Sequence, residues 1–217
     1  MLWLDTDFEH SECYSSYDME PWVLKAMQRW PNVPAVFGWL SLDRRGRWLI
    51  KDELITRPQI VDTINANYGC DEHGRWFFQN GPQRGYMRLA YAPWVLRTQG
   101  DGLVTHTRCP VERIARVCLD EEGSLLLETE HGAGVLSDTD LEWALMRIVC
   151  DAGAAEADDL AAALQQPSDS VTRLAFSWQG KQLPIVRLDF SAQPRVFKFE
   201  RHPEPLPNER VSSGAPD

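Results

Sequence analysis

The sequence predicts an α+β protein made of antiparallel β-hairpins with helices packed against them, arranged as two small subdomains. Short runs of alternating apolar and polar residues lie between turn residues, as in paired antiparallel strands. The turn string Asp-x-x-Gly recurs at Asp43–Gly46, Asp71–Gly74 and Asp120–Gly123. In such a turn the Asp supplies a side-chain acceptor and the Gly a positive φ. Stretches with apolar residues at helical spacing separate the hairpins, and local hairpins with separate helices define the α+β class.

The composition bounds the size and class of the protein. Its 217 residues suit one large domain or two small ones that share a core. A hydrophobic fraction of 43% is ordinary for a soluble protein, whereas 9 tryptophans are many, so large flat side chains must fill the core or line a groove. The formal net charge of −10 repels a phosphate backbone, which predicts that nucleic acid is not a partner.

The sequence predicts a cytoplasmic protein with no membrane partner. The first residues lack the basic and apolar regions of a signal peptide, and no apolar run is long enough to span a bilayer. The 5 cysteines are scattered along the chain, which is typical of reduced thiols, and their odd number leaves at least one without an intramolecular disulfide partner.

Residues 1–34 are predicted to form a loose acidic arm followed by a helix. The arm extends to about Met19. Glu20-Pro21 begins the helix, because proline is tolerated in the first turn, and Pro31 ends it. Apolar residues recur at helical spacing along one stripe, which favours a core-facing seam over a binding surface. The stripe consists of Trp22, Val23, Ala26, Met27 and Trp30.

Residues 35–99 are predicted to form the first subdomain, in the order hairpin, helix, hairpin. The first hairpin spans Val36–Ile50 and reverses at its Asp-x-x-Gly turn. A helix then begins at Thr56-Arg57-Pro58 and carries apolar residues at helical spacing as far as Tyr68.

The second hairpin of this subdomain reverses at Asn80-Gly81, the strongest short turn signal in the chain. Its returning strand alternates, so Tyr86 and Arg88 are expected on one face and Met87 and Leu89 on the other. The turns Asp43–Gly46 and Asp71–Gly74 both continue into the string Gly-Arg-Trp, which indicates a weak internal repeat.

Residues 100–200 are predicted to form the second subdomain, which begins at the boundary Gly100-Asp101-Gly102. Strands, a glycine turn, two helices, a hairpin and a final short strand follow one another. In order these are strands over residues 103–108, 111–119 and 124–129, a turn at Gly132 and Gly134, helices over 137–149 and 154–166, a hairpin over 171–190, and a strand over 196–199. Residues 201–217, rich in proline, serine and charge, are predicted to be a flexible tail.

The loop Gln79–Arg84 is the candidate binding site. It places carboxamides and a guanidinium between aromatic strands, and such groups orient a ligand at the mouth of an aromatic pocket, with Arg84 a natural partner for a carboxylate or phosphate. The alternative is that the loop is turn chemistry alone. The full predicted set is Trp76, Gln79, Asn80, Gln83, Arg84, Tyr86, Arg88, Trp94 and Arg97.

Three Cys and His pairs are spaced as in zinc sites. They are His10-x-x-Cys13, Cys70-x-x-His73 and His106-x-x-Cys109. Two such pairs would complete the tetrahedral shell of a structural zinc ion. The alternative is ordinary thiols beside loop histidines, so the presence of a metal stays undecided at this point.

Signatures of catalysis and of cofactor binding are missing from the sequence. It contains no nucleophile elbow, no phosphate-binding loop, no dinucleotide fingerprint and no His-Glu-x-x-His helix, so no cofactor and no catalytic residue is assigned. Cys109 with His106 would be a nucleophile and base, but residues three apart on a strand point to opposite faces. The acidic residues near Asp120 and Asp158 are attributed to turn and helix-surface charge.

At Gly74–Arg84, GRWFFQNGPQR, and Ala92–Val95, APWV, the chain resembles a family of proteobacterial proteins known only as a domain of unknown function. The likeness covers residues 70–97. More loosely, the order of Asp-x-x-Gly hairpin, helix and Pro110-Val111-Glu112 before a strand is similar to another family of unknown function, whose fold repeats α+β motifs and for which a signalling role is suggested. Neither resemblance implies catalytic residues.

We therefore expect a non-catalytic cytoplasmic binding or regulatory module that uses the Gln79–Arg84 loop and the adjacent aromatic residues, with an unknown small molecule or protein as its partner. The alternatives are a small-molecule enzyme with its site between the two subdomains, and a protein with a structural zinc site.

Overall fold

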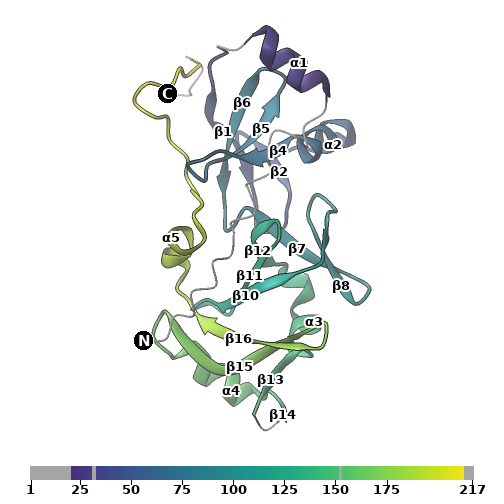
Figure 1. Ribbon diagram of the computed structural model, residues 1–217, viewed down its shortest axis with the longest axis vertical. Coiled ribbons are helices and arrows are strands. Elements are labelled where there is room, and N and C mark those ends of the chain that lie inside the picture. Colours follow the sequence, from purple (N-terminus) through teal and green to yellow (C-terminus); the bar gives the residue numbers. More distant parts are fainter. Residues whose placement is uncertain (1–20, 31–32, 152, 213–217) are drawn as a thin grey trace.

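Two mixed β-sheets lie one above the other along the long axis of the molecule (Figure 1). The computed structural model describes residues 21–30, 33–151 and 153–212. In this part of the chain the first sheet has the strand order β3-β2-β1-β6-β5-β4 and the second the order β14-β13-β15-β16-β10-β11-β12-β7-β8-β9. The strands of the first sheet are β1 (Val36–Leu42), β2 (Trp48–Ile50), β3 (Glu53–Leu54), β4 (Tyr68–Cys70), β5 (Trp76–Asn80) and β6 (Gln83–Leu89). Those of the second are β7 (Trp94–Gln99), β8 (Gly102–Thr105), β9 (Pro110–Val111), β10 (Ile114–Leu119), β11 (Leu125–Thr129), β12 (Gly132–Leu136), β13 (Ile148–Cys150), β14 (Gly153–Ala154), β15 (Ser170–Trp178) and β16 (Lys181–Arg187).

The protein is mostly β, with a few short helices, which is compatible with the predicted α+β class. The helices are α1 (Pro21–Arg29), α2 (Pro58–Ala66), α3 (Leu141–Leu145), α4 (Ala157–Leu164) and α5 (Gln193–Phe197), with 3₁₀ turns η1 (Asp138–Asp140) and η2 (Phe190–Ala192). The expected antiparallel hairpins are present at β1–β2, β5–β6 and β15–β16. They are only part of the topology, because β1 pairs with β6, β10 with β16 and β12 with β7 in parallel.

The three Asp-x-x-Gly turns share one hydrogen-bond pattern. In each turn, Oδ1 of the Asp accepts from the backbone N–H groups two and four residues later. The distances are 2.9 and 2.8 Å at Asp43, 3.0 and 3.0 Å at Asp71, and 3.0 and 2.7 Å at Asp120. The recurring string therefore reflects one local solution, in which a carboxylate caps the turn and a glycine closes it with positive φ.

The chain passes from the first sheet to the second at residues 90–93, between β6 and β7. The sequence placed a subdomain boundary near Gly100, but Gly100 and Asp101 form the turn of the β7–β8 hairpin inside the second sheet. Gly132 and Gly134, expected in a turn, lie in β12. A Cβ on Gly134 would come within 2.8 Å of Leu96, so the glycine permits close approach of β12 to its parallel neighbour β7.

Several helices are shorter than expected because strand pairing takes over their ends. α2 ends at Ala66, and Tyr68, expected on that helix, begins β4 opposite Phe78. The predicted helix over 137–149 is limited to a 3₁₀ turn and α3, since Ile148 pairs with Phe176 in β13. The predicted strand over 196–199 is replaced by α5, which has Pro194 in its first turn.

α1 occupies the expected position. Its Val23 is fully buried, whereas Trp22 and Trp30 are 48% and 51% exposed. The apolar stripe is therefore core-facing only in part. The acidic arm predicted before this helix lies outside the described residues.

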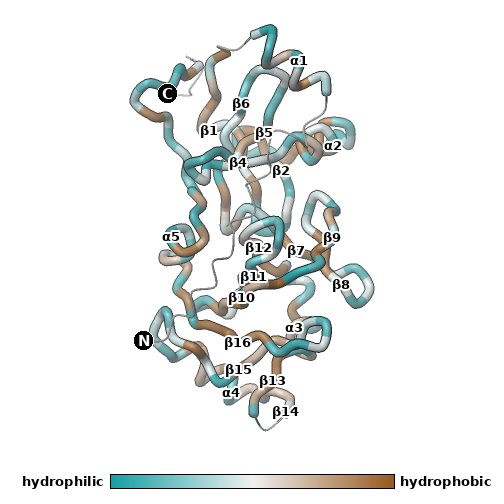
Figure 2. Tube along the Cα trace, viewed as in Figure 1, coloured by the Kyte–Doolittle hydropathy of each residue, from teal (hydrophilic) through white to brown (hydrophobic). Residues whose placement is uncertain are grey.

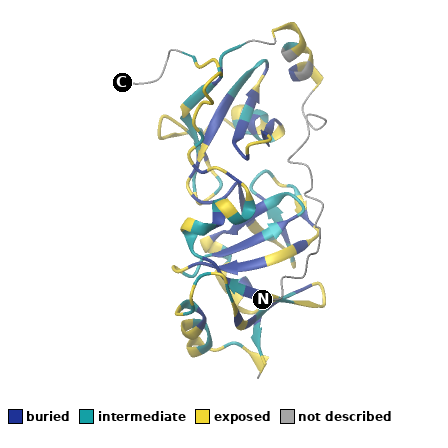
Figure 3. Ribbon diagram, turned by 60° about the vertical axis from the view of Figure 1, so that its left-hand side comes forward, coloured by how far each residue is buried: buried dark blue, intermediate teal, exposed yellow. Residues whose placement is uncertain are grey.

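Aromatic side chains join the two sheets. The rings of Trp48, Tyr68 and Trp76 come from the first sheet and meet Trp94 and His106 of the second, with centroid separations from 4.9 to 5.8 Å. The buried segments of both sheets meet at this level in Figure 3, and Figure 2 shows apolar segments in both sheets, so one core continues through the molecule.

The chain after α5 returns to the first sheet as the yellow coil in Figure 1. Arg201 is buried, with its Nε donating to the carbonyl of Tyr91 at 2.7 Å, and Val211 forms a parallel bridge with Ala35. Residues 201–212 of the predicted flexible tail are therefore attached by specific contacts, which their polar composition did not reveal. Among the described residues, no helix has the length and apolarity needed to cross a bilayer.

Candidate functional site

The structure brings part of the predicted set together on one face of the first sheet. β5 and β6 pair in the register Phe77 with Tyr86 and Gln79 with Arg84, and alternate residues of a strand share a face. Gln79, Arg84 and Tyr86 therefore lie side by side. We call this surface the arginine-aromatic face and define it by Phe37, Arg75, Phe77, Gln79, Arg84 and Tyr86.

The loop between β5 and β6 is held by its own polar groups. Gln79 is completely buried, and its Nε2 donates to the Gly81 carbonyl at 2.8 Å. Arg84 Nε donates to Gln79 Oε1 at 3.0 Å, and Gln83 Nε2 donates to the Pro34 carbonyl at 3.0 Å. Asn80 is exposed. These contacts give the carboxamides of Gln79 and Gln83 a structural role, while Asn80 is exposed and Arg84 is half-buried.

The two predicted tryptophans lie elsewhere. Trp76 and Trp94 are 4% and 2% exposed and pack edge to face at 5.2 Å in the aromatic junction between the sheets. Trp94 Nε1 donates to the His131 carbonyl at 2.6 Å. Because both rings are buried among other side chains, they stabilise the junction and do not line an open pocket.

The remaining two arginines of the predicted set are held at the periphery. Arg88 forms an exposed ion pair with Asp52, and Arg97 Nη2 donates to the Arg45 carbonyl at 2.6 Å. Arg88 shares its strand face with Tyr86 and stands beyond it. Neither contact joins these side chains to the loop.

The centre of the arginine-aromatic face is Arg75, which the sequence did not single out. The Asp-x-x-Gly turn positions it, since Asp71 Oδ1 accepts from the Arg75 N–H at 3.0 Å while Asp71 Oδ2 accepts from Arg75 Nε at 2.8 Å. The first turn of the same kind builds the same contact, from Arg47 Nε to Asp43 Oδ2, on the surface. At the second turn the pair is buried, with side chains 6% and 2% exposed.

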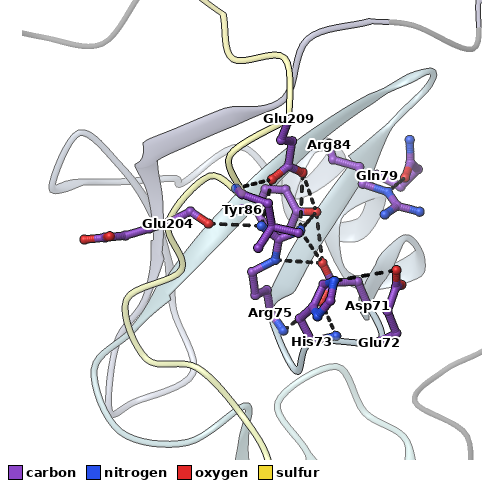
Figure 4. Close-up of polar contacts among 10 residues, drawn as sticks. Asp71, Glu72, His73, Arg75, Gln79, Arg84, Tyr86, Glu204 and Glu209 are labelled. Carbon is purple, nitrogen blue, oxygen red and sulfur yellow. Dashed lines mark hydrogen bonds and ion pairs between the residues drawn. The ribbon is translucent and has the colours of Figure 1, made fainter.

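The other side of the Arg75 guanidinium binds the tail. Nη1 donates to Glu209 Oε2 at 2.7 Å and Nη2 to Glu209 Oε1 at 3.3 Å, so the guanidinium holds this carboxylate with two nitrogens (Figure 4). Nη1 also donates to the Glu204 carbonyl at 3.0 Å. In Figure 4 the Glu204 side chain extends away from the guanidinium while Glu209 points toward it.

Aromatic rings form the base of this site. The Arg75 guanidinium lies 4.4 Å from the ring centroid of Tyr86, which stacks on Phe37 at 4.4 Å and 11°. The Tyr86 hydroxyl accepts from Arg75 Nη2 at 2.9 Å and lies 3.0 Å from Asp71 Oδ2 and 3.2 Å from Glu209 Oε1. It therefore donates its single proton to one of two carboxylates. Arg84 lies over the neighbouring ring of Phe77 at 4.3 Å.

The charges of the site shift the pKa values of its members. Burial would raise the pKa of Glu209 and of Asp71, but the hydrogen bonds and charge of Arg75 outweigh burial and hold both pKa values below their ordinary range. Burial raises the pKa of Tyr86 to about 12, so its phenol stays protonated. At neutral pH one guanidinium thus faces two carboxylates and a neutral hydroxyl.

A signal for part of this site was present in the sequence. An Arg four residues after the Asp of an Asp-x-x-Gly turn occurs twice, at Arg47 and Arg75, and marks a carboxylate–guanidinium pair. Glu209 gave no such signal, since it belongs to a polar tail whose partner lies far away in the sequence.

The described residues do not bring the proposed metal ligands together. No group of three or more His, Cys, Asp or Glu side chains suited to a metal occurs within the described ranges. His106 Nδ1 accepts from the Val95 N–H at 3.3 Å, while Cys109 Sγ contacts Thr107 Oγ1 at 3.5 Å. The pair His10 and Cys13 lies outside the described residues. Zinc therefore gains no support here, and the separate contacts of His106 and Cys109 also leave them without the geometry of a nucleophile and its base.

A groove of about 970 Å³ lies on the second sheet, lined by β10, β15, β16 and α5. Its nucleophile candidates are Cys118 and Ser168. Burial raises the pKa of the Cys118 thiol to about 12, which keeps it protonated, and Ser168 Oγ accepts from the Asp189 N–H at 2.9 Å. Neither is poised for attack, and the lining residues include no histidine.

Comparison with known proteins gives a family and no activity. The sequence profile of a family described as a protein of unknown function (DUF2946) matches residues 19–204. Two solved structures are similar, both of DUF1285 family proteins. The one from Silicibacter pomeroyi DSS-3 is 16% identical with a TM-score of 0.47 and covers 82% of this chain and 92% of its own. The one from Shewanella baltica OS155 is 13% identical with a TM-score of 0.38 and covers 48% and 87%. No curated protein matches the chain. The resemblance to a domain of unknown function is thereby confirmed.

Proposed function

The chain belongs to this family of proteins of unknown function, and we propose that it is a non-catalytic binding module that recognises carboxylate groups on its arginine-aromatic face, with the Gln79–Arg84 loop at one end. The observation that carries the proposal is the two-nitrogen ion pair between the Arg75 guanidinium and the Glu209 carboxylate. A guanidinium that binds a carboxylate through two nitrogens above a stacked aromatic pair has the geometry of a carboxylate receptor.

Arg84 provides a second cation beside the first. It is partly exposed, lies over Phe77 and has no ion-pair partner among the described residues, whereas Arg75 is already paired. A ligand with more than one carboxylate can therefore engage Arg84 from solvent. The exposed Asn80 stands at the same end of the face and offers an amide for orientation.

The rival class, an enzyme with its site between the subdomains, has less support. The junction between the two sheets is filled by Trp48, Tyr68, Trp76, Trp94 and His106. Burial, with the charge of Arg97 adding to it, lowers the pKa of His106 to about 3, so this imidazole is neutral and remains a weak base. A junction filled in this way holds the two sheets together.

Titration of the full chain with acetate, succinate and citrate, followed by amide NMR spectra, tests the proposal. We expect shifts near Asn80 and Arg84 that grow with the number of carboxylates and that Arg84→Ala abolishes while its melting temperature stays close to that of the wild type. Arg88→Ala is the matched control, since this arginine shares the strand face but lies beyond the site. Lower stability with unchanged binding in Arg84→Ala and Asn80→Ala would sink the idea.

A further inference from the structure

The tail forms one parallel β-bridge directly before β1 of the first sheet. The N–H of Ala35 donates to the carbonyl of Arg210 at 2.9 Å, and the N–H of Ser212 donates to the carbonyl of Ala35 at 2.9 Å. Ala35 and Val211 thereby form a parallel bridge. An extended peptide that adds to the edge of a sheet makes the same main-chain contacts.

The beginning of β1 offers an edge for this addition. β2 pairs with β1 only from Leu40 to Leu42, whereas β6 pairs with β1 already at Val36. One side of β1 near Ala35 is therefore left for another chain segment. Unpaired N–H and C=O groups on a strand edge are a template for pairing.

Side-chain recognition accompanies the main-chain pairing. Two residues before Val211, the Glu209 carboxylate reaches Arg75, and it also accepts from the Leu206 N–H at 3.0 Å. The N–H of Glu209 donates to the Leu206 carbonyl at 2.9 Å, so residues 206–209 form a compact turn that presents the carboxylate. The bound segment is thus recognised through one glutamate side chain and, two residues later, through main-chain pairing at the strand edge.

The attachment is of a kind that can be exchanged. Leu206 and Val211 remain 40% and 41% exposed, so the tail buries little apolar surface there. When Glu209 leaves, Arg75 keeps its buried ion pair with Asp71 and is not left as an unpaired cation. Segments held by few apolar contacts open locally at low free energy.

We propose that the arginine-aromatic face, together with the Ala35 edge of β1, is a docking site for an extended acidic segment of a partner protein, and that residues 204–212 occupy it in competition with that partner. The proposal rests on the proposed function, because it names the partner and the regulation of the same site. The motif that the site recognises is a glutamate in an extended segment that pairs with the strand edge, with a turn before the glutamate.

A tethered competitor lowers the apparent affinity for a partner in proportion to the fraction of time that it occupies the site. Weakening the tail should therefore strengthen binding in trans. If the tail occupies the site about nine-tenths of the time, its release raises the apparent affinity about tenfold.

The test uses full-length protein and a fluorescent peptide with the sequence of residues 203–212, PEPLPNERVS, with binding followed by anisotropy. We expect the peptide to bind Glu209→Gln about tenfold more tightly than the wild type. Glu204→Gln is the matched control and should behave as wild type, because only the backbone carbonyl of Glu204 contacts Arg75. A peptide with Gln in place of its Glu209 should not bind.

Equal binding to the wild type and Glu209→Gln, or no binding to a Glu209→Gln protein with an unchanged circular dichroism spectrum, overturns the inference. A wild-type dimer in light scattering that Glu209→Gln converts to a monomer assigns the site to the tail of a second copy and also overturns it. If carboxylates bind through Arg84 but the peptide does not bind, the proposed function is retained and the inference is rejected. Peptide binding that Arg84→Ala leaves unchanged supports the inference, because the Glu209 carboxylate binds Arg75.

Discussion

The carbonyl oxygen of Lys198 lies directly against the α-carbon of Gly74, at the point where the chain returns to the first sheet. A Cβ on Gly74 would lie 2.3 Å from that oxygen, and the φ of Gly74 is +74°. The Gly74 carbonyl in turn accepts from the Glu200 N–H at 2.9 Å. The turn that positions Arg75 is thus also the place where the tail begins its path along the sheet.

Gly74→Ala is expected to lower the free energy of unfolding by about 3 kcal/mol, because it combines left-handed strain with a clash against backbone. Gly123→Ala is the matched control in the equivalent turn, where φ is +85° and nothing lies within 4 Å of the added Cβ. It should lose only about 1 kcal/mol. Urea denaturation measures both, and equal losses would contradict the role given to the Lys198 contact.

Asp71 and Glu209 bind the same guanidinium but should contribute unequally to stability. Asp71→Asn is expected to lower the free energy of unfolding by about 3 kcal/mol, since its buried carboxylate serves both Arg75 and the turn. Glu209→Gln should lower it by about 1.5 kcal/mol, because Glu209 is nearer to solvent. Chemical denaturation of both variants tests this order, and a larger loss in Glu209→Gln would reverse our view of the site.

Acid should release the tail before it unfolds the sheets. The pKa of Glu209 is lowered in the folded state, so the stabilisation is present above the ordinary pKa of a glutamate and is lost as pH falls through the lowered value. Backbone NMR relaxation of residues 204–212 should show increased motion in wild type as the pH falls below the ordinary glutamate pKa of about 4.3 and through the lowered pKa of Glu209. In Glu209→Gln we expect the same motion already at pH 7, and a rigid tail in that variant would refute the mechanism.

His106 should make stability depend on pH over a higher range. Burial, with Arg97 adding to it, lowers its pKa to about 3, and its Nε2 is buried without a hydrogen-bond partner in the described part of the chain. The unfolded chain binds a proton near pH 6.5 and the folded chain does not, so stability is full above pH 6.5 and falls below it. Between pH 7 and 5 the wild type should lose about 2 kcal/mol more than His106→Gln. Urea denaturation of the wild type and His106→Gln at pH 7 and pH 5 measures this difference.

The sequence predicted the elements whose cause is local. The hairpins at Asp43 and Asp71 follow from a carboxylate and a glycine within four residues, and α1 follows from its proline and its apolar spacing. Where an apolar run is short, period alone does not separate helix from strand, which is why Tyr68 and Ile148 were expected on helices. The parallel pairing of β1 with β6 is fixed by contacts between distant segments, for which a single sequence carries no local signal.

The candidate site was predicted in the same uneven way. The turn signal at Asn80-Gly81 points to the nearby Gln79, Arg84 and Tyr86, and their shared face follows from strand alternation. The sequence does not single out Arg75, because the adjacent string Asp71–Gly74 predicts only a turn. Glu209 cannot be predicted from the sequence, since nothing local distinguishes it from the other acidic residues of the tail.

The separation of 134 residues between Arg75 and Glu209 has a consequence for synthesis on the ribosome. All strands of both sheets are synthesised before Glu209 is added to the chain. The first sheet therefore assembles while its edge at Ala35 is open and while Asp71 is the carboxylate bound to Arg75. Because chains fold from the N-terminus as they emerge, the nascent protein passes through a period in which the site is formed and its own competitor does not yet exist. A partner present during translation would bind the arginine-aromatic face without competition from residues 204–212.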